Sequence, residues 1–191
     1  MRLIIVRHGL TDDNRLRICQ GQTHGVLSKV GRHQSELTGK ALKSIAIDAI
    51  YSSDLHRAIE TAEAIAKHHT GTPFANDQRL RERYFGSLQG KPFPPPTEEL
   101  PQSTEYETPE EIMERIESFI TTLLQSHTDK QTILIVSHGF AIRVMFAMFD
   151  HLPATDASAI PEIDNTSISI VELTAQREYR IIQFNDTKHL V

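Results

Sequence analysis

Residues 2–9 (RLIIVRHG) form the stretch that decides the fold expected for this chain. The four residues that follow Arg2 are apolar and mostly β-branched, which is typical of a strand buried on both faces of a sheet. The apolar run then ends abruptly in an arginine, a histidine and a glycine. Residues 132–139 (TILIVSHG) show the same pattern, an apolar run followed by a polar residue, a histidine and a glycine. We therefore predict two buried strands, each of which ends in a His-Gly pair.

Helical and strand patterns alternate along the rest of the chain. Apolar residues recur at helical spacing in residues 31–45, 54–68, 109–124 and 140–149, and short strand-like runs occupy residues 2–6, 49–51, 132–137, 166–173 and 179–184. Ser53 or Asp54 is placed to cap the second helix, and Thr108 with Pro109 to begin the third. This alternation predicts a mostly parallel sheet with helices on both faces, which is a three-layer α/β/α sandwich.

Length, charge and cysteine content narrow the class of protein. A chain of 191 residues can bury a core as one domain, 1–191, without disulfides or structural zinc. Its net charge of −5 argues against a nucleic-acid partner, although a few focused arginines can still bind one small anion. The lone Cys19 fits a reducing compartment. Since no apolar run is long enough for a signal peptide or membrane helix, we expect a soluble, cytoplasmic protein with no membrane partner.

Prolines set residues 86–107 apart from the rest of the chain. This stretch holds Pro92, Pro94, Pro95, Pro96 and Pro101, so it cannot form a regular helix. We interpret it as a lid, or excursion, over one end of the sheet. A surface loop without a role is an equally weighted alternative on composition alone.

The two His-Gly pairs predict a site at one edge of the sheet. Because the carboxyl ends of parallel strands meet at the same edge, we expect the imidazoles of His8 and His138 to face each other. Gly9 and Gly139 allow the backbone to turn sharply and to approach a ligand closely. A single histidine is more often structural, but two at equivalent strand ends favour a functional pair.

Two arginines add positive charge to this edge. Arg7 precedes the first histidine, and Arg57 lies one turn into a helix that follows the second strand. Taken alone, Arg57 would be interpreted as an exposed residue paired with Glu60 or Asp54. Together with the histidines, the two guanidinium groups indicate a pocket for a dianionic phosphoryl group. Their charge would lower the pKa of a nearby imidazole and keep it neutral and nucleophilic.

A general acid is also needed to protonate the leaving alkoxide. Glu82 comes just before the proline-rich stretch and is a candidate. Spacing alone does not separate it from Glu60 or Glu107, so all three carboxylates stay open at this point.

These residues, in this order, resemble the histidine phosphatase superfamily, also called the phosphoglycerate mutase-like family. The resemblance runs from residue 2 to about residue 173. The matching pieces are Arg7-His8-Gly9 with Thr11 and Asn14, Gln20-Gly21, Leu27-Ser28 with Gly31 and Gln34, Ser52-Ser53-Asp54-Leu55 with Arg57-Ala58 and Thr61-Ala62, Leu80-Arg81-Glu82 with Gly86 and Gly90, Ser137-His138-Gly139, and Asn165-Thr166-Ser167. Each piece is a weak signal, but their joint order and spacing is specific.

The resemblance implies a role for each residue of the site. It implies that His8 becomes phosphohistidine and that Glu82 donates a proton and then activates water. It also implies that Arg7, Arg57 and His138 bind the phosphoryl group, with His138 stabilising the transition state. By the same resemblance, further substrate-binding residues are Asn14, Gln20, Gly21 and Gly139.

No metal or other cofactor is implied by the resemblance. The sequence contains no HExxH motif and no cysteine cluster. The pair His68-His69 is interpreted as a solvated helix end. The expected partner is a small phosphorylated substrate, and the oligomeric state, a homodimer included, stays open.

Two stretches depart from the family pattern. Leu10 stands where a glutamate or glutamine is usual, so local hydrogen bonding is expected to differ. The stretch Glu105-Tyr106-Glu107-Thr108 keeps only the Glu-Thr part of the usual Gly-Gly-Glu-Ser, which puts substrate contacts from that stretch in question.

The chain length and the modest excursion favour the phosphatase branch of this family. We expect hydrolysis of a sugar phosphate or similar metabolite. The alternatives are a cofactor-dependent phosphoglycerate mutase and a non-catalytic module that binds a phosphorylated ligand. Basic residues that could hold a second phosphate or a carboxylate are Arg15, Arg17, Arg81, Arg83 and Lys91.

Overall fold

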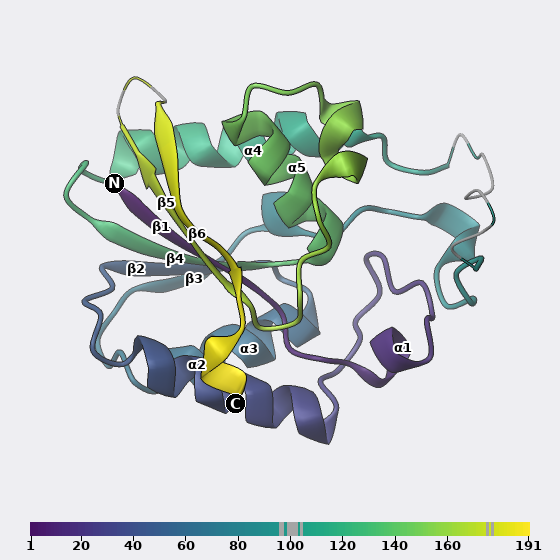
Figure 1. Ribbon diagram of the computed structural model, residues 1–191, viewed down its shortest axis with the longest axis horizontal. Helices are drawn as coiled ribbons and strands as arrows, with labels where there is room; N and C mark the ends of the chain where they lie inside the picture. The colour runs from purple at the N-terminus through teal and green to yellow at the C-terminus, as the bar shows by residue number, and fades with distance from the viewer. Residues whose placement is uncertain (96–97, 99–102, 104, 175, 177) are drawn as a thin grey trace.

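The computed structural model describes residues 1–95, 98, 103, 105–174, 176 and 178–191 (Figure 1). The strands are β1 (Arg2–Arg7), β2 (Ala49–Ser52), β3 (Phe74–Asn76), β4 (Thr132–Ser137), β5 (Ile168–Leu173) and β6 (Tyr179–Asp186). The α-helices are α1 (Asp12–Arg15), α2 (Lys29–Leu42), α3 (His56–Ala66), α4 (Pro109–Ser126) and α5 (Gly139–Phe149). Short 3₁₀ turns cover Gln78–Leu80, Gly86–Leu88, Ala154–Ala159 and Lys188–Leu190.

One sheet organises the molecule, and its strands lie in the order β3-β2-β4-β1-β5-β6. The first four of these strands are parallel, and β5 runs antiparallel to both β1 and β6. Helices α4 and α5 cover one face of the sheet, and α2 and α3 cover the other (Figure 1). The predicted three-layer α/β/α fold with a mostly parallel sheet is therefore confirmed.

The central strands are buried on both faces, as their apolar runs predict. Along β1, Leu3 and Ile5 belong to the core that includes α4 and α5, whereas Ile4 and Val6 pack with α3 on the opposite face. All four side chains are fully or almost fully buried. Burial of this extent stabilises the sheet by roughly 1.5–3 kcal/mol for each large aliphatic side chain. The core thus fixes the strand ends from which the predicted site projects.

The structure contains two short elements that were not predicted, and it corrects one predicted helix cap. Strand β3 is absent from the prediction because it has three residues, all exposed, and shows no alternation. Helix α1 is also absent from it, since one turn carries no helical periodicity. Neither Ser53 nor Asp54 caps α3; its N-cap is Leu55, without a side-chain cap. The carboxylate of Asp54 is instead held by two hydrogen bonds from Arg81, at 2.7 and 2.5 Å.

The start of α4 forms as predicted. The hydroxyl of Thr108 accepts a hydrogen bond from the backbone N–H of Glu111, whose side chain accepts one from the N–H of Thr108. Pro109 occupies the first turn, where its missing N–H costs nothing. Among the described residues, no helix is both long and apolar enough to cross a membrane.

The proline-rich stretch begins as an ordered wall. Residues 17–19 pair with residues 90–93 through backbone hydrogen bonds, two of them between Cys19 and its partners Lys91 and Gly90, each 2.8 Å long. A third, 2.7 Å long, runs from the N–H of Phe93 to the carbonyl of Arg17. The predicted lid also includes residues 96–97, 99–102 and 104, which lie outside the described residues.

Candidate active site

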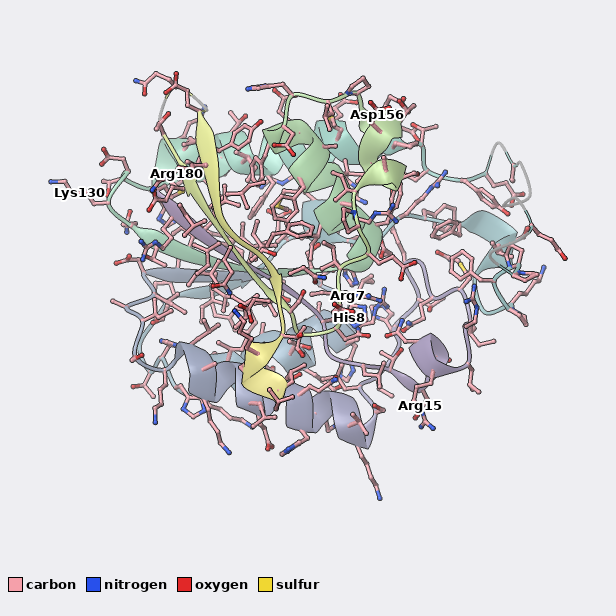
Figure 2. All side chains as sticks on the ribbon, viewed as in Figure 1. Arg7, His8, Arg15, Lys130, Asp156 and Arg180 are labelled. Carbon is pink, nitrogen blue, oxygen red and sulfur yellow. The ribbon has the colours of Figure 1, made fainter. Side chains whose placement is uncertain are left out.

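The two predicted histidines lie side by side at the carboxyl edge of the sheet. Strands β1 and β4 are parallel neighbours in which Arg7 is paired with Ser137, so His8 and His138 follow at the same level. Their ring centroids are 5.1 Å apart, and both side chains are buried. Figure 2 shows Arg7 and His8 near the middle of the molecule, where β1 ends. Strand register alone therefore brings together two residues that are 130 positions apart (138 − 8 = 130).

Arg57 reaches the same place from the first turn of α3. Its side chain is buried, with 1% exposed, and its Nε lies 3.3 Å from Nε2 of His8. Two further hydrogen bonds, each 2.7 Å long, run from its terminal nitrogens to the carbonyls of Thr23 and Gly21. The alternative of an exposed Arg57 paired with Glu60 or Asp54 is therefore wrong.

The hydrogen bonds of His8 define its tautomer. Nδ1 lies 2.8 Å from the carbonyl oxygen of Gly9, which can only accept, so Nδ1 carries the proton. Nε2 therefore presents a lone pair. Burial lowers the pKa of His8 well below its ordinary value, and the charges of Arg57 and Arg7 lower it further. A neutral imidazole with an unprotonated Nε2 is the form that a nucleophilic histidine requires, and here Nε2 accepts only the long hydrogen bond from Nε of Arg57.

His138 differs from His8 in having no partner for its ring. Among the described residues, neither Nδ1 nor Nε2 of His138 finds a hydrogen-bond partner, although both atoms are buried. Burial, and then the charge of Arg57, lowers its pKa well below the ordinary value. An unpartnered buried imidazole next to His8 is suited to donate a hydrogen bond to an oxyanion that enters the site.

Arg7 completes the cationic end of the site. One of its terminal nitrogens donates to the carbonyl of Ile163, while its Nε is buried without a partner among the described residues. Its guanidinium lies against Gly139 at the start of α5: a Cβ built on this glycine would be 3.4 Å from the Cζ of Arg7, at van der Waals contact.

The structure separates Glu82 from the two carboxylates that spacing left open. Glu60 accepts hydrogen bonds from the N–H of Leu27 and from Arg32, and Glu107 pairs with Arg115. Glu82 alone of the three lines the pocket with His8. Its carboxylate accepts hydrogen bonds from the N–H groups of Arg83, Phe140 and Ala141, at 2.8, 3.2 and 3.2 Å. It thus lies at the positive end of α5, close to the reacting centre.

The smaller predicted contacts also gather here. Asn14 and Gln20 line the pocket, and the Oε1 atom of Gln20 is buried without a partner among the described residues. Gly21 has a φ of +49°, a conformation that favours glycine, and its carbonyl accepts from Arg57. Asn165, which belongs to the matching piece Asn165-Thr166-Ser167 but was not predicted as a site residue, also contacts the site. Its Nδ2 donates a hydrogen bond to the carbonyl of His8 at 2.9 Å.

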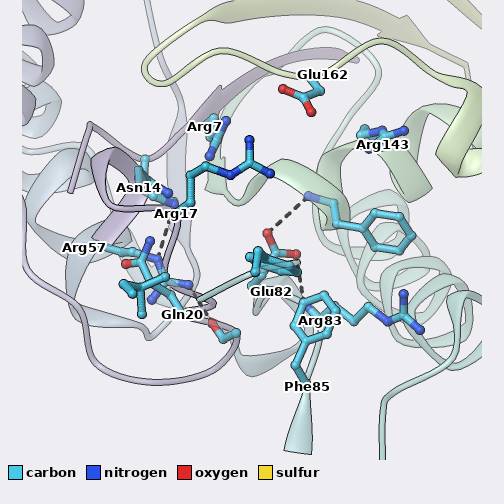
Figure 3. Close-up of a pocket in the computed structure, with 15 residues that line it drawn as sticks. Arg7, Asn14, Arg17, Gln20, Arg57, Glu82, Arg83, Phe85, Arg143 and Glu162 are labelled. Carbon is cyan, nitrogen blue, oxygen red and sulfur yellow. Dashed lines mark hydrogen bonds between the residues drawn. The ribbon is translucent and has the colours of Figure 1, made fainter. Parts of the chain in front are cut away.

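The pocket continues outward beyond the predicted residues. It has a volume of about 430 Å³. Its outer part contains residues to which the sequence pattern assigns no role or only an open one: Arg17, Ile18, Arg83, Phe85, Phe93, Phe140, Arg143 and Glu162 (Figure 3). Arg143 follows Gly139 by one helical turn, so helical spacing could have identified it. Nothing in the local sequence pattern points to Glu162.

The candidate basic residues fall into two groups. Arg17 and Arg83 line the pocket. Arg15 pairs with Asp12, Arg81 pairs with Asp54, and Lys91 is exposed outside the pocket lining. Among the described residues, no group of three or more His, Cys, Asp or Glu side chains is arranged to hold a metal ion.

The departures from the family pattern are accommodated by the backbone. The N–H of Leu10 donates to Gln34 at 3.2 Å, and its carbonyl accepts from the N–H and the hydroxyl of Ser28. Glu105 accepts from the N–H of Ser87, at 3.2 Å. Among its described residues, the stretch 105–108 contributes nothing to the pocket lining.

Comparisons with known proteins find one matching family and several similar proteins. Residues 3–187 match the profile of the histidine phosphatase superfamily (branch 1). An uncharacterized phosphatase of Bacillus subtilis, PhoE, is 32% identical over 97% of this chain and 95% of its own. A probable phosphoglycerate mutase of Salmonella arizonae, GpmB, is 32% identical over 90% of this chain and 85% of its own. A mycobacterial glucosyl-3-phosphoglycerate phosphatase, solved in complex with VO₃, superposes with a TM-score of 0.87 at 27% identity, over 97% of this chain and 99% of its own.

Proposed function

Because the chain belongs to the histidine phosphatase superfamily, we propose that it hydrolyses a small phosphomonoester through a phosphohistidine formed on His8. The observation that carries the proposal is a pocket at the carboxyl edge of the sheet that is lined by His8, Arg57 and Glu82, with the ring of His138 centred 5.1 Å from that of His8. The low pKa of His8 keeps its nucleophilic form available at neutral pH.

The first step transfers the phosphoryl group to the enzyme. Nε2 of His8 attacks phosphorus, a bond from nitrogen to phosphorus forms, and the bond from phosphorus to the ester oxygen breaks. Glu82, protonated for this step, transfers its proton to the departing alkoxide. Arg7, Arg57 and His138 stabilise the charge on the transferred oxygens in the transition state.

The second step regenerates the enzyme. Glu82 is now a carboxylate and removes a proton from water as the water oxygen attacks the phosphohistidine. The nitrogen–phosphorus bond breaks, inorganic phosphate leaves and Glu82 is again protonated. One carboxyl group thus serves as acid and then as base, and no metal is required by these steps.

The substrate in this proposal is a small phosphorylated metabolite. Among the comparison proteins, glucosyl-3-phosphoglycerate phosphatase acts on a ligand of this kind, and the pocket volume of about 430 Å³ suits one. We further propose that the chain acts in the cytoplasm as a single domain, with residues 86–107 as a lid over the leaving group. The lone Cys19 supports the cytoplasmic location, and the place of Phe93 in the pocket lining supports the lid.

The central test traps the intermediate. The protein is mixed with ³²P-labelled p-nitrophenyl phosphate and quenched in alkali, in which phosphohistidine survives. We expect a protein-bound label that acid removes, and His8→Asn should abolish both the label and turnover. The matched control is His33→Asn, an exposed residue of α2. Full activity of His8→Asn would contradict the mechanism.

A phosphoglycerate mutase is the second candidate, because GpmB is among the relatives. Assays of 3-phosphoglycerate, with and without 2,3-bisphosphoglycerate, separate the two activities. Release of inorganic phosphate supports the hydrolase, whereas net isomerisation supports the mutase. A binding module without turnover would show saturable binding of phosphorylated metabolites and no product across a broad panel.

A further inference from the structure

The arginines of this protein divide into two sets by their partners. Among the described residues, every arginine outside the pocket has a carboxylate oxygen within 4.0 Å. The five arginines that line the pocket, namely Arg7, Arg17, Arg57, Arg83 and Arg143, have no such partner among the described residues. Positive charge that is left unpaired in one cavity indicates an anionic ligand.

One phosphoryl group does not account for all five arginines. Arg7 and Arg57 lie at the inner end beside His8, where the phosphoryl group is proposed to bind. The pocket contains two carboxyl groups, Glu82 and Glu162, so its formal charge with neutral histidines is +3 (5 − 2 = +3) when both are ionised, and it is more positive when Glu82 is protonated as the proposed transfer requires. A bound phosphomonoester of about −2 leaves a charge of about +1. The remaining positive charge belongs to the outer arginines.

Arg83 and Arg143 are both held in place where they line the outer pocket. Both guanidinium groups lie over the ring of Phe140, with Cζ 5.4 and 5.7 Å from its centroid. Arg83 donates one hydrogen bond, from Nε to the carbonyl of Glu107 at 2.7 Å, and Arg143 donates one to the carbonyl of Ser158. Each arginine is therefore fixed by a ring and a carbonyl, and further N–H groups stay available to a ligand.

Arg17 occupies the mouth of the pocket in an unusual backbone conformation. Its φ is +55°, in the left-handed region that residues with a Cβ rarely adopt. The residue is held there by backbone hydrogen bonds, one from its N–H to Asn14 and one from Phe93 to its carbonyl. Figure 3 shows its side chain extending into the pocket opening. Its side chain makes one long hydrogen bond, 3.5 Å, to the carbonyl of Pro94 and has no carboxylate partner among the described residues. A strained position with such an arginine favours a role in ligand binding over one in folding.

We propose that Arg17, Arg83 and Arg143 form an outer anion subsite for the leaving group. The preferred substrates are then phosphomonoesters whose leaving group carries a second negative group, either a carboxylate or a second phosphate, a few bonds from the ester oxygen. Phe85, Phe93 and Phe140 contact the carbon part between the two charges. This inference rests on the proposed hydrolysis and identifies the class of substrate on which it acts.

The test compares leaving groups that carry a second negative charge with one that does not. The substrates are 3-phosphooxypropanoate, its primary amide and propane-1,3-diol bisphosphate, and kcat/KM is measured for each. We expect the two charged esters, or the one of them whose second anion fits, to exceed the amide by about tenfold, the effect of one good charge-assisted hydrogen bond. Arg17→Gly should lower this ratio severalfold and should fold normally, because glycine adopts a positive φ without strain.

Two further variants test whether the ratio of kcat/KM follows the charge of the pocket in the expected direction. Arg143→Gln should also lower the ratio of carboxylate to amide, whereas Glu162→Gln should raise it, because it removes a negative charge from the same pocket. The matched control is Arg15→Gln, which changes an exposed arginine of α1 outside the pocket and should leave the ratio unchanged. Equal kcat/KM for the charged esters and the amide would overturn the inference.

Binding without turnover separates this inference from the proposed function. The uncleavable pair 4-phosphonobutanoate and its amide gives the same comparison by calorimetry. If the carboxylate binds more tightly but no ester is hydrolysed, the outer subsite stands and the hydrolase proposal fails. If p-nitrophenyl phosphate is hydrolysed and the two phosphonates bind equally, the hydrolase proposal stands and the outer subsite is wrong.

Discussion

Nε of Arg57 lies 3.3 Å from Nε2 of His8, and Nδ1 of the same imidazole lies 2.8 Å from the carbonyl of Gly9. The two contacts together select one tautomer, with the proton on Nδ1 and the lone pair on Nε2. They also set the charge state, because the guanidinium lowers the pKa of His8 in addition to the effect of burial. One arginine of α3 thus orients the proposed nucleophile and keeps it neutral.

Replacement of this arginine should change the pH dependence of the enzyme. In Arg57→Gln, the pKa of His8 should rise, so the acid limb of the kcat/KM profile for p-nitrophenyl phosphate should move to higher pH. At neutral pH we expect a loss of about 10²–10³-fold, as for other transition-state donors. Arg57→Lys keeps the charge and should leave the acid limb near that of the wild type. An unmoved acid limb in Arg57→Gln would contradict this role.

A second prediction concerns how Glu82 is positioned. Arg115 donates to the carbonyls of Arg79 and Glu82, at 2.6 and 3.3 Å, and pairs with Glu107 at 2.7 Å. Glu107 in turn accepts from the N–H of Tyr84, at 3.1 Å. The pair Arg115–Glu107 therefore holds the backbone on both sides of Glu82, and we expect it to act as a positioning pair for the proposed general acid.

Arg115→Lys should lower kcat more than it raises KM, by about 10-fold to 100-fold for an alkyl phosphate. Nitrophenolate leaves without needing a proton, so p-nitrophenyl phosphate should be affected much less. Glu82→Gln should show the same dependence on the leaving group, and Arg180→Lys, an exposed pair with Glu172, serves as the control. Equal losses on both substrates would indicate a structural role only.

The sequence is sufficient to predict those parts of the site that depend on the order of residues within a short segment. The apolar runs before His8 and His138 define β1 and β4, and parallel pairing then puts the two residues together. The role of Arg57 could not be predicted in this way, because only the structure shows that its side chain is buried beside His8 while Asp54 and Glu60 pair with other arginines.

Other features depend on tertiary contacts that no local pattern shows. Glu82 could not be separated from Glu107 by spacing, since the difference is which one meets the first turn of α5. Glu162 reaches the pocket from the segment before β5 and leaves no periodic signal. The exposed strand β3 could not be predicted either, because its three residues show no apolar alternation and only their pairing with β2 makes them a strand.

Stability should fall in mild acid because of the two buried histidines. The pKa values of His8 and His138 lie well below 6.5 in the folded state, whereas the unfolded chain titrates near 6.5. As the pH falls below 6.5, the unfolded state binds more protons, so the free energy of unfolding decreases until the folded pKa values are reached.

Urea unfolding between pH 7.5 and 5 measures this effect. The double variant His8→Asn/His138→Asn should lose less stability over this range than the wild type, because it lacks both groups. His33→Asn, which replaces an exposed histidine, should lose as much as the wild type. The comparison uses the change with pH within each protein, so any constant cost of the substitutions cancels. An equal loss in the double variant would show that other groups dominate the acid sensitivity.

The thiol of Cys19 should be inert in the folded protein and should report opening of the pocket wall. Its side chain is fully buried, and burial raises its pKa to about 12, with a further contribution from Glu82. The thiolate needed for alkylation is therefore scarce at neutral pH. Because its backbone pairs with Gly90 and Lys91, exposure of the thiol requires this pairing to open.

We expect the thiol of Cys19 to react slowly with iodoacetamide at pH 8 and rapidly in urea. With inorganic phosphate bound, the reaction should be slower still, since the ligand stabilises the closed wall. A reaction as fast as that of a free cysteine would show that the wall formed by residues 17–19 and 90–93 is open in solution.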